Sequence, residues 1–445
     1  MQKFLKTIFY LLFSLSSFAQ WNVVDFGAKG DGKTLNTREI QTAIDSCYQA
    51  GGGKILFTNG VFLTGTIYLK SNVYLEIESG AVLRGSDHPA DYPVIETSKA
   101  LIYAGGAENT GITGNGVIDG RGDDLDVMER PRPHIIHFRF CKNIKIKDIR
   151  LYNAAFWVQK YQSCDNLLID GITVDSRENK NIEQARFIDV PGGRNCDGCN
   201  IVDCRNVRIA NCNINSGDDG IVFKSFSRQS GCFNIAVTNC VITTNASGIK
   251  IGTESAGAFS DISITNCSVY DTRGAAIGLM TVDGASMERI LVSNITLRNI
   301  KGTALFLRLA NRGTLYEKND EPRLGTMQDI LIQNIYGTEI ERYGCSITGL
   351  PNLKPTNIVL DHIHLNFCDG RQPLLFEGYP NRPVAEPSTE IPELEPVYPR
   401  GEMFGKLPAY GLYIRHVNGI ALRNIHLNAL DPAEKRPAII KVDVQ

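Results

Sequence analysis

The sequence lacks both an excess of charge and long apolar segments. Its 46 Lys and Arg residues are balanced by 48 Asp and Glu, leaving a formal net charge of −2. A basic surface for nucleic acid or for an anionic membrane needs a clear excess of positive charge, which argues against both as partners. Only one apolar run, at the N-terminus, approaches membrane length, so we expect no stable membrane insertion of the mature chain.

That N-terminal run predicts export. Lys3 and Lys6 precede an apolar stretch that ends in Ser17-Phe18-Ala19, the pattern of a secretory signal peptide (residues 1–19) cut before Gln20. A membrane anchor is the alternative, but the apolar core is short. We therefore expect a mature monomer that is periplasmic, cell-surface or secreted. A composition of 43% hydrophobic and 21% charged residues excludes disorder and collagen for this mature part.

A pattern of two short alternating strands, joined by one or two polar residues, recurs along the chain. The copies begin at Asn143, Asn166, Asn206, Asn234, Asp261, Arg289, Asp329, Asn357 and Gly419. Successive copies lie 23, 40, 28, 27, 28, 40, 28 and 62 residues apart, a basal period of 23 to 28 with insertions. Helical repeats are longer and have a 3.6-residue period. The pattern predicts an all-β, right-handed parallel β-helix that forms a single domain over residues 20–445.

Two segments depart from the repeat. Residues 37–50 have helical periodicity, with Ile40, Ala43, Ile44 and Cys47 on one face. We expect a short helix that caps the open N-terminal turn. The last gap between copies holds a long insertion at about 366–416, with seven Pro between Pro373 and Pro399. Loops of this length are usually functional or mobile, so this one is a candidate lid.

Twelve cysteines in an exported protein ordinarily indicate disulfides. Cys212, Cys240 and Cys267, however, occupy the position that isoleucine fills in other copies, which favours buried thiols in the core. The spacing of three other cysteines is somewhat like that of zinc ligands, but no second pair or nearby His completes the set, so we expect no metal. These three are Cys196, Cys199 and Cys204.

A polar residue at the corner of each copy predicts a structural ladder. Stacked side-chain amides can hydrogen-bond along the axis of a solenoid. The corner residues in five copies are Asn211, Asn239, Asn266, Asn294 and Asn334.

Three carboxylates stand outside the repeat. Asp197 lies in Asn195-Cys-Asp-Gly198, and Asp218 and Asp219 lie in Gly217-Asp-Asp-Gly220. Because 21 and 22 residues are close to one turn of the solenoid, we expect all three on one face. When carboxyl groups are crowded, one of them can keep its proton while another is ionised. Glycosidic hydrolysis needs one carboxyl group in each of these states. Each motif taken alone is also typical of a tight turn.

Together these motifs resemble glycoside hydrolase family 28, which contains polygalacturonases and rhamnogalacturonan hydrolases. The resemblance extends over about Val23–Asn311 and includes four further segments. These are Asp25–Gly32, Arg132–His134, Asn153–Trp157 and Gly220–Ser225. It implies a right-handed β-helix in which Asp218 is the general acid, Asp197 and Asp219 hold and deprotonate the attacking water, and the anomeric configuration is inverted.

The chain departs from the family pattern at two places. Where the family usually has Gly-His-Gly, this chain has Asn245-Ala-Ser247-Gly248-Ile-Lys250-Ile-Gly252-Thr-Glu254-Ser255. One turn later, where polygalacturonases have Arg-Ile-Lys, it has Ala275-Ala-Ile-Gly278-Leu-Met280. Leucine or methionine cannot replace a charge-assisted contact with a sugar carboxylate. We therefore expect a hydrolase that is not a standard endo-polygalacturonase.

Seven further residues are candidate substrate contacts. They are Asn195 beside the first aspartate, Trp157 as a sugar-stacking ring, and five charged residues on the following turns, Lys224, Lys250, Glu254, Arg308 and Arg312. None of these residues requires a metal or another cofactor. The expected partner is a polysaccharide or oligosaccharide.

Two other classes of function stay open at this stage. A β-helix polysaccharide lyase would use a cation or a basic side chain on a uronate, and would form an unsaturated product. A glycan-binding solenoid that has lost catalysis would bind sugars without cleaving them. The three aspartates favour a hydrolase over both.

Overall fold

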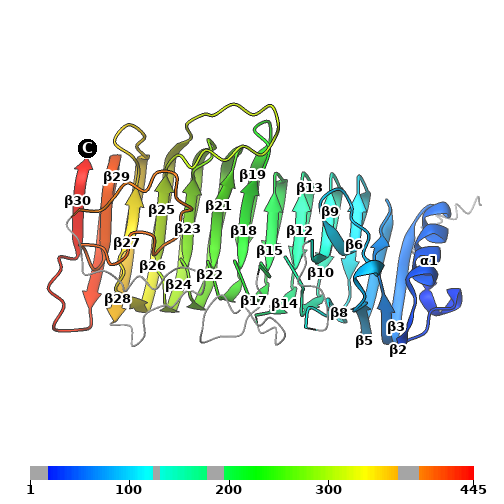
Figure 1. Cartoon of the computed structure of the whole chain (residues 1–445). Coiled ribbons are helices and arrows are strands. Elements are labelled where there is room, and N and C mark those ends of the chain that lie inside the picture. Colours follow the sequence, from blue (N-terminus) through cyan, green and yellow to red (C-terminus); the bar gives the residue numbers. More distant parts are fainter. Residues whose placement is uncertain (1–18, 124–130, 178–194, 369–389) are drawn as a thin grey trace, which may run out of the picture.

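The repeat copies stack as parallel strands, one turn of the chain on the next (Figure 1). The computed structural model describes residues 19–123, 131–177, 195–368 and 390–445. Copies that lie 40, 28 and 62 residues apart pair in register, as Leu167 with Val207, Ile262 with Ile290, and Ile358 with Ile420. The register expected from the sequence is therefore confirmed, and the fold is an all-β parallel β-helix.

Each turn contributes strands to two sheets, which we call sheet A and sheet B. Sheet A contains the repeat copies; its strands are β1 (Gln20–Asn22), β2 (Asp31–Leu35), β3 (Gly53–Thr64), β5 (Val73–Gly85), β7 (Glu108–Thr113), β8 (Val117–Asp119), β10 (Lys142–Lys147), β11 (Arg150–Tyr152), β13 (Asp165–Asp170), β14 (Thr173–Ser176), β16 (Arg205–Ala210), β17 (Asn213–Ser216), β19 (Gly231–Thr238), β20 (Val241–Thr244), β22 (Ala258–Thr272), β24 (Ser286–Ile300), β26 (Thr326–Glu341) and β28 (Thr356–Cys368).

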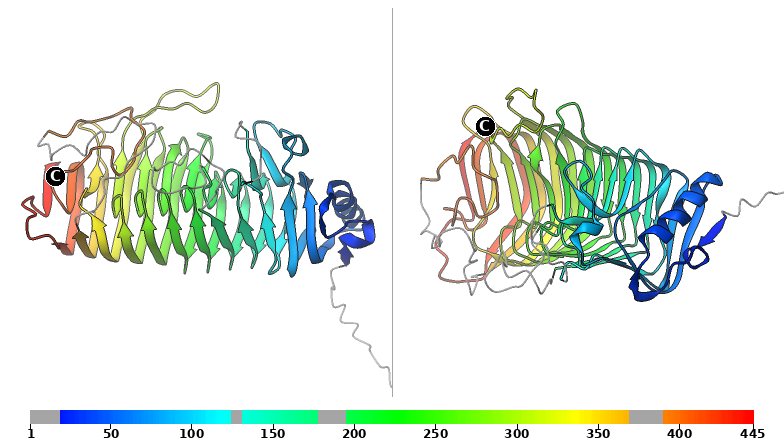
Figure 2. Two further views of the ribbon diagram at one scale, coloured as in Figure 1. Left: turned by 60° about the horizontal axis from the view of Figure 1, so that its bottom comes forward. Right: turned by 45° about the vertical axis from the view of Figure 1, so that its right-hand side comes forward.

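Sheet B forms the other face of the solenoid and holds the candidate site. Its strands are β4 (Ile67–Tyr68), β6 (Lys99–Gly105), β9 (Pro133–Arg139), β12 (Gln159–Gln162), β15 (Cys199–Val202), β18 (Ile221–Ser225), β21 (Ile249–Ser255), β23 (Ile277–Thr281), β25 (Leu305–Leu309), β27 (Cys345–Thr348) and β30 (Ile439–Val444). Strand β29 (Leu412–Ala429) runs through both sheets. Two views from other sides show the strands as one uninterrupted stack (Figure 2).

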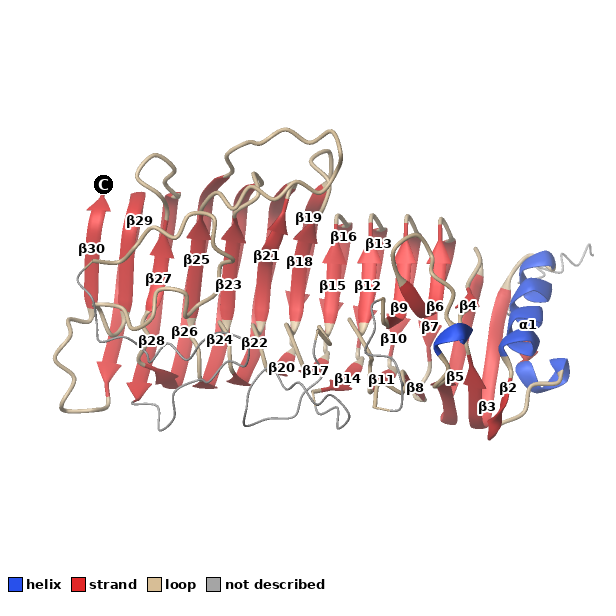
Figure 3. Cartoon of the chain, in the orientation of Figure 1, coloured by secondary structure: helices blue, strands red, loops and turns tan. Residues whose placement is uncertain are grey.

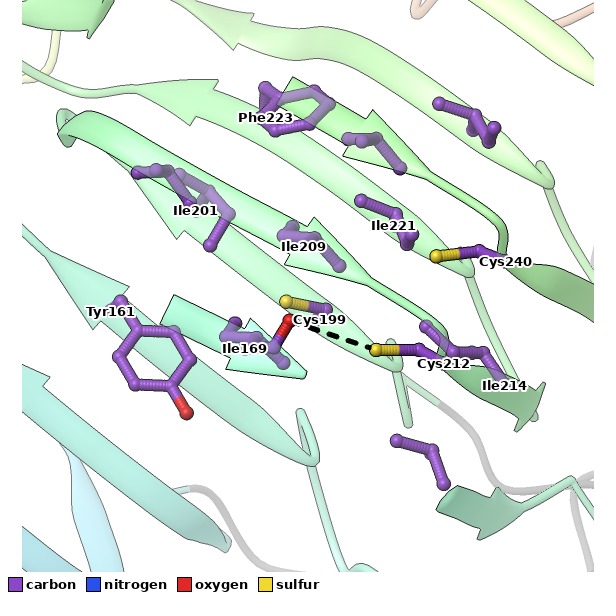
Figure 4. Close-up of a cluster of buried hydrophobic side chains, with 14 of the residues drawn as sticks. Tyr161, Ile169, Cys199, Ile201, Ile209, Cys212, Ile214, Ile221, Phe223 and Cys240 are labelled. Atoms are coloured by element: carbon purple, nitrogen blue, oxygen red, sulfur yellow. Dashed lines mark hydrogen bonds between the residues drawn. The ribbon is translucent and has the colours of Figure 1, made fainter. Parts of the chain in front are cut away.

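In the strands, successive side chains point to opposite faces, and those on the inner face form a continuous core of Ile, Val, Leu and Phe. The thiols predicted to lie there do so: Cys212, Cys240 and Cys267 are buried and unpaired. Figure 4 shows Cys199, Cys212 and Cys240 packed among apolar side chains, with the Cys212 thiol 4.0 Å from the Ile169 carbonyl oxygen. All twelve cysteines are free thiols in this structure.

The corner asparagines form the predicted ladder. Each adopts the left-handed conformation that Asn tolerates, with φ between 54° and 57°. The Asn294 amide donates to Asn266 at 3.1 Å, and the Asn334 amide donates to Asn294 at 3.0 Å. The ladder therefore fixes the corner of one turn over the next.

The N-terminal turn is capped by helix α1 (Thr37–Gln49) (Figure 3). Its buried residues are those predicted from the sequence, namely Ile40, Ala43, Ile44 and Cys47. Gly51 and Gly52, at φ 98° and 113°, end the helix and return the chain to β3. Within the described ranges, the other helical segments are 3₁₀ turns, η1 (Val23–Phe26) and η2 (Pro89–Asp91).

The long insertion leaves sheet A after β28 at Cys368 and rejoins the stack at Leu412 in β29, close to the predicted limits. Its described part crosses the outer face of sheet B and is called here the covering segment (residues 390–407). The predicted signal peptide lies outside the described residues, except for Ala19. In the described chain, no helix is long and apolar enough to cross a membrane.

Candidate active site

The candidate site is built on the turns that lead into successive strands of sheet B. The Gly198 N–H donates to the Asp219 carbonyl at 2.8 Å, and the Gly220 N–H donates to the Ser247 carbonyl at 2.8 Å. These bonds place Asp197, Asp219 and Ser247 in one column, each one turn after the other. The expectation that the aspartates lie one turn apart is confirmed.

Glycine permits this close stacking. A Cβ atom at Gly198 would lie 2.7 Å from the Gly220 carbonyl oxygen, and one at Gly220 would lie 2.4 Å from the Gly248 carbonyl oxygen. Both distances are too short for any side chain. The glycine after each aspartate motif is therefore required by the approach of the next turn.

The three aspartates are almost entirely removed from solvent. Asp197, Asp218 and Asp219 are 3%, 6% and 4% exposed. The Asp218 carboxylate accepts the Asp219 N–H at 2.9 Å, and Ser216 donates to the Asp218 carbonyl at 2.8 Å, which fixes the turn. Buried carboxylates crowded in this way can remain ionised only when cations or hydrogen-bond donors compensate them.

Two buried lysines on sheet B supply those cations. Lys250 on β21 lies 2.8 Å from an Asp219 carboxylate oxygen, and the Ser247 N–H donates to the other oxygen at 3.0 Å. Lys224 on β18 lies 3.4 Å from Asp197 and 3.3 Å from Glu254. The two lysines are part of the carboxylate cluster rather than solvated lysines at its edge.

The cluster retains a proton near neutral pH. Burial, opposed by Lys224 and reinforced by the charges of Asp218 and Asp219, raises the pKa of Asp197 to about 8. Burial would likewise raise the pKa of Glu254, but Lys224 and Lys250 outweigh it and hold that pKa below its usual range. For Lys224, burial lowers the pKa, but Glu254 and Asp197 outweigh burial and raise it, so this lysine stays charged.

Asn195 and Trp157 border the cluster on its N-terminal side. The Asn195 amide lies 3.5 Å from Asp218, and its oxygen accepts a hydrogen bond from Arg132 at 2.9 Å. The Trp157 ring lies 4.2 Å from the Lys224 ammonium and stacks on Phe156 with an interplanar angle of 4°. This pair is half-buried, so a flat apolar surface adjoins the carboxylates.

Arg312 lies at the margin of the site. Its guanidinium binds both oxygens of Asp283, at 2.9 and 2.5 Å, and lies 5.6 Å from the Tyr398 ring. Its remaining hydrogen bond goes to the Tyr316 hydroxyl, so the guanidinium is held by Asp283 and Tyr316 beside the site.

Arg308 is not a substrate contact in this structure, which corrects our expectation. Its side chain does leave the outer face of β25, but it is 0% exposed. It donates to the carbonyls of Gly349 at 3.2 Å and Glu393 at 2.5 Å, beneath the covering segment. The sequence predicted the direction of the side chain correctly but carried no signal of what would cover it.

Three residues at the site escaped the sequence analysis. The Tyr398 hydroxyl lies 3.3 Å from the Lys250 ammonium, and Arg273 and Arg400 line a pocket beside Asp219. Arg273 follows strand β22 and lies two residues before Ala275, which continues the column of Asp219 and Ser247, so its place could have been read from the repeat. Tyr398 and Arg400 lie in the insertion, which has no repeat register from which to place them.

The described residues hold no group of three His, Cys, Asp or Glu side chains arranged to bind a metal ion. The chemistry available to the arrangement is that of a proton-sharing carboxylate cluster with two fixed cations.

A family model and several known proteins match this chain. The model of the family "Glycosyl hydrolases family 28" matches residues 47–373, which include every residue of the carboxylate cluster. A probable polygalacturonase of Vitis vinifera is 32% identical over 46% of this chain and 44% of its own length. An exo-poly-alpha-D-galacturonosidase of Dickeya chrysanthemi is 42% identical over 23% of this chain and 19% of its own length. The chain thus spans less than half of these curated relatives.

Among solved structures, the exopolygalacturonase from Thermotoga maritima has the same fold, with a TM-score of 0.65 over 92% of both chains at 21% identity. The family match extends over most of the chain and contains the stacked aspartate turns. The chain therefore belongs to glycosyl hydrolases family 28.

Proposed function

We propose that this protein hydrolyses glycosidic bonds in an anionic, pectin-type polysaccharide or oligosaccharide by acid and base catalysis on Asp197, Asp218 and Asp219. The observation that carries the proposal is the burial of three carboxyl groups on adjacent turns, with the pKa of Asp197 raised to about 8. A site with one retained proton and one ionised carboxylate supplies both groups that the reaction needs.

Asp219 is the ionised member of the cluster. The Lys250 ammonium and the Ser247 N–H contact its two oxygens at 2.8 and 3.0 Å, and both contacts favour the carboxylate form. We assign Asp219 as the group that deprotonates the attacking water. The proton for the leaving oxygen comes from the remaining pair, Asp197 and Asp218, and the resemblance to the family assigns the donation to Asp218.

The mechanism proposed here inverts the anomeric carbon in one step. Water attacks the carbon while its proton passes to the base, the glycosidic bond breaks, and the leaving oxygen takes the proton of the acid. No metal or other cofactor takes part. The fixed charges of Lys224 and Lys250 hold the carboxylates in place, so the site is organised before substrate arrives.

Lys250 also accounts for one departure from the family pattern. In the segment that lacks the family's histidine, the Ser247 N–H donates to one Asp219 oxygen, while the Lys250 ammonium donates to the other. We propose that this lysine fulfils the role of a positively charged partner for the base. The protein is on this view active, though not as a standard endo-polygalacturonase.

Export by the N-terminal segment fits a polymeric substrate outside the cytoplasm. We propose a periplasmic, cell-surface or secreted location, with the protein acting as a monomer. Fractionation of cells that produce the full chain, with N-terminal sequencing of the mature protein, tests this. An uncleaved protein in the cytoplasm would contradict it.

The function is tested by release of reducing ends from polygalacturonate, rhamnogalacturonan and their oligosaccharides. We expect release that is at least about a hundredfold slower in Asp218→Asn. Asp261→Asn, a corner residue paired with Arg289 far from the cluster, is the matched control and should behave as wild type. Product that absorbs in the ultraviolet would instead indicate a lyase. Glycan binding without cleavage, unchanged in Asp218→Asn, would indicate a binding solenoid.

A further inference from the structure

Strand β21 is irregular beside the carboxylate cluster. It pairs in register with β18, its neighbour in the stack (Figure 1), up to Ile251, and the pairing resumes at Ser255. Between these points one residue of β18, Lys224, faces three residues of β21, the last of which is Glu254. A bulge of this kind changes the direction in which a strand presents its side chains, and bulges are frequent next to active sites. Here the bulge brings Glu254 opposite Lys224.

The bulge is held at both of its ends. Gly252 has a φ of 93°, and a Cβ atom there would lie 2.6 Å from the Met280 carbonyl oxygen, so this position needs glycine. At the other end, the Ser255 N–H donates to the Asp283 carboxylate at 3.2 Å, and the Ser255 hydroxyl accepts the Asp283 N–H at 3.1 Å. The backbone on each side of Glu254 is therefore fixed by its neighbours.

The Lys224 ammonium lies between two carboxylates at almost equal distances. It is 3.4 Å from Asp197 and 3.3 Å from Glu254, and the Trp157 ring lies 4.2 Å from it. The lysine side chain is only 7% exposed, so its charge has to be balanced within the protein. One positive charge is thus shared by two carboxylates on different turns.

Asp219 has a closer cation. The Lys250 ammonium donates to it at 2.8 Å, which is shorter than either contact of Lys224. A cation at this distance favours the ionised carboxylate, whereas a shared and more distant cation offsets the burial of Asp197 only in part. This agrees with the pKa of Asp197, which burial raises to about 8 against the effect of Lys224 and with that of the other two aspartates.

Other titratable groups also face the two carboxylates that share Lys224. Those that interact with Asp197 are Asp218, Asp219 and Lys250, and those that interact with Glu254 are Lys250, Arg312 and Tyr316. Arg312 and Tyr316 both bind the Asp283 carboxylate, at 2.5 and 2.9 Å. Lys224 lies within 3.4 Å of both carboxylates, so it is the group through which a change at one of them reaches the other.

We propose that Glu254 is a positioning residue that keeps a proton on the catalytic aspartates by sharing Lys224 with Asp197. While Glu254 is ionised, the ammonium compensates it and cannot fully compensate Asp197. Without Glu254, Lys224 would pair with Asp197 alone and favour its ionised form, and the cluster would lose the acid that the reaction needs. In this role Glu254 acts through Lys224 and needs no contact with the sugar. The inference rests on the proposed function only for the link between this proton and the rate.

The first test is the pH–rate profile of Glu254→Gln, which keeps the size of the side chain and removes its charge. We expect the basic limb of kcat/KM to move to lower pH by about one unit, because loss of a negative neighbour and release of Lys224 both lower the pKa of Asp197. Activity should be about tenfold below wild type at about pH 9 and close to wild type at about pH 5. Glu108→Gln, an exposed residue beside Lys142 on sheet A, is the matched control.

Two other results would overturn the assignment. A KM that rises equally at every pH, with the basic limb unmoved, would show that Glu254 contacts the substrate. A fall in kcat that is the same at every pH would show that Glu254 only supports the structure. Glu254→Asp, which keeps the charge, should have a basic limb closer to that of wild type than to that of Glu254→Gln.

Lys224→Met tests the sharing from the other strand. Removal of the cation raises the pKa of a neighbouring carboxyl group, so the basic limb should move to higher pH, opposite to its shift in Glu254→Gln. In the double variant the glutamate substitution should have a smaller effect than it has beside Lys224, because no cation remains to be released. Equal shifts with and without the lysine would overturn the sharing. Lys224→Met also carries the test if Glu254→Gln does not fold.

Urea denaturation follows the same proton without substrate. An aspartate in the unfolded chain ionises at about pH 4, whereas folded Asp197 keeps its proton to about pH 8. Its contribution to stability is therefore complete below about pH 4 and is lost as the pH rises toward about 8. In Glu254→Gln this loss should end about one pH unit lower. The pKa of Glu254 lies below its usual range, so above about pH 5 the substitution adds no slope of its own.

This measurement separates the role of Glu254 from the proposed function. A loss of stability that ends at lower pH in Glu254→Gln, in a protein that hydrolyses no glycan, would refute the proposed function and leave the role of Glu254 standing. A loss that is unchanged in Glu254→Gln would refute that role, whatever the activity of the protein.

Discussion

The outer face of sheet B has two halves with the same backbone arrangement. The positively charged side chains have different kinds of partner in the two halves. Before the pocket, Lys224 and Lys250 pair with carboxylates at 3.4 and 2.8 Å. Past the pocket, Arg308 and Arg415 donate to main-chain carbonyls of the covering segment. Lys250 and Phe306 even lie in one row, on strands paired in register through Gly278.

The difference shows that the solenoid backbone does not by itself decide where chemistry occurs. The same arrangement of paired strands carries a cluster of charged side chains in one half and packed apolar side chains in the other. Carboxylates that compensate lysines give a cluster of paired charges that adjoins a pocket. Where main-chain carbonyl groups compensate the arginines, the covering segment is held against sheet B, because the charges have their partners within the protein itself.

The largest expected effect tests the catalytic half. Asp219→Asn keeps the size of the side chain but removes the ionised base, so kcat/KM on the preferred oligosaccharide should fall by about a thousandfold. The measurement is steady-state kinetics at the pH optimum. Asp175→Asn, a partly exposed carboxylate paired with Arg150, is the control. Retention of more than a tenth of wild-type activity in Asp219→Asn would remove this residue from the mechanism.

The next effect tests the half of sheet B that lies beneath the covering segment. Met280→Lys introduces a charge among the buried apolar side chains of Phe306, Phe404 and Leu407, next to the buried Arg308 with which Met280 pairs in register. We expect the free energy of unfolding to fall by about 3 kcal/mol, since the new charge has no partner there. Urea denaturation and limited proteolysis of the covering segment measure this. Met280→Leu is the control, and equal stability of the two variants would show that the face is not sealed.

A smaller effect concerns the cation that holds the base. Lys250→Met removes the 2.8 Å contact with Asp219, so kcat/KM should fall by about tenfold to a hundredfold. Loss of the neighbouring positive charge raises the pKa of a carboxyl group, so the acidic limb of the pH–rate profile should move to higher pH. Lys441→Met, an exposed lysine on β30, should change neither quantity. An unmoved acidic limb in Lys250→Met would separate this lysine from the base.

Measured per pH unit, the smallest effect is the dependence of stability on pH. An aspartate in the unfolded chain ionises near pH 4, whereas the pKa of Asp197 in the folded protein is about 8. The folded protein therefore binds the extra proton between these values. Its contribution to stability is complete below about pH 4 and is lost as the pH rises toward about 8, by about 1 kcal/mol per pH unit. Urea denaturation at several pH values measures the slope, and Asp197→Asn should flatten it. A parallel slope in both proteins would place the retained proton elsewhere.

Much of the fold was predictable because stacked turns repeat their constraints. Each copy of the pattern had to bury the same positions, so the spacing of Asn206, Asn234 and Asp261 already gave the register of sheet A. The same spacing placed Asp197 beside Asp219. The buried thiol at position 212 followed from the isoleucines at equivalent positions, since the core accepts either side chain.

The covering segment was not predictable in this way. Arg308 meets Glu393 across 85 residues, and Lys250 meets Tyr398 across 148. No local pattern encodes either contact, because the insertion has no repeat period and its position depends on apolar packing against sheet B. For that reason Arg308 was assigned to substrate, while Tyr398 and Arg400 were not assigned at all.

The sequence alone determined the parallel β-helix, the helix that caps it and the column of aspartates, because each of these follows from local periodicity and from stacking at a fixed interval. Only the tertiary structure decided which positively charged side chains pair with the carboxylates and which bind the covering segment. Pairing of buried charges depends on what lies across the interface, and here that partner comes from a segment far away in the chain.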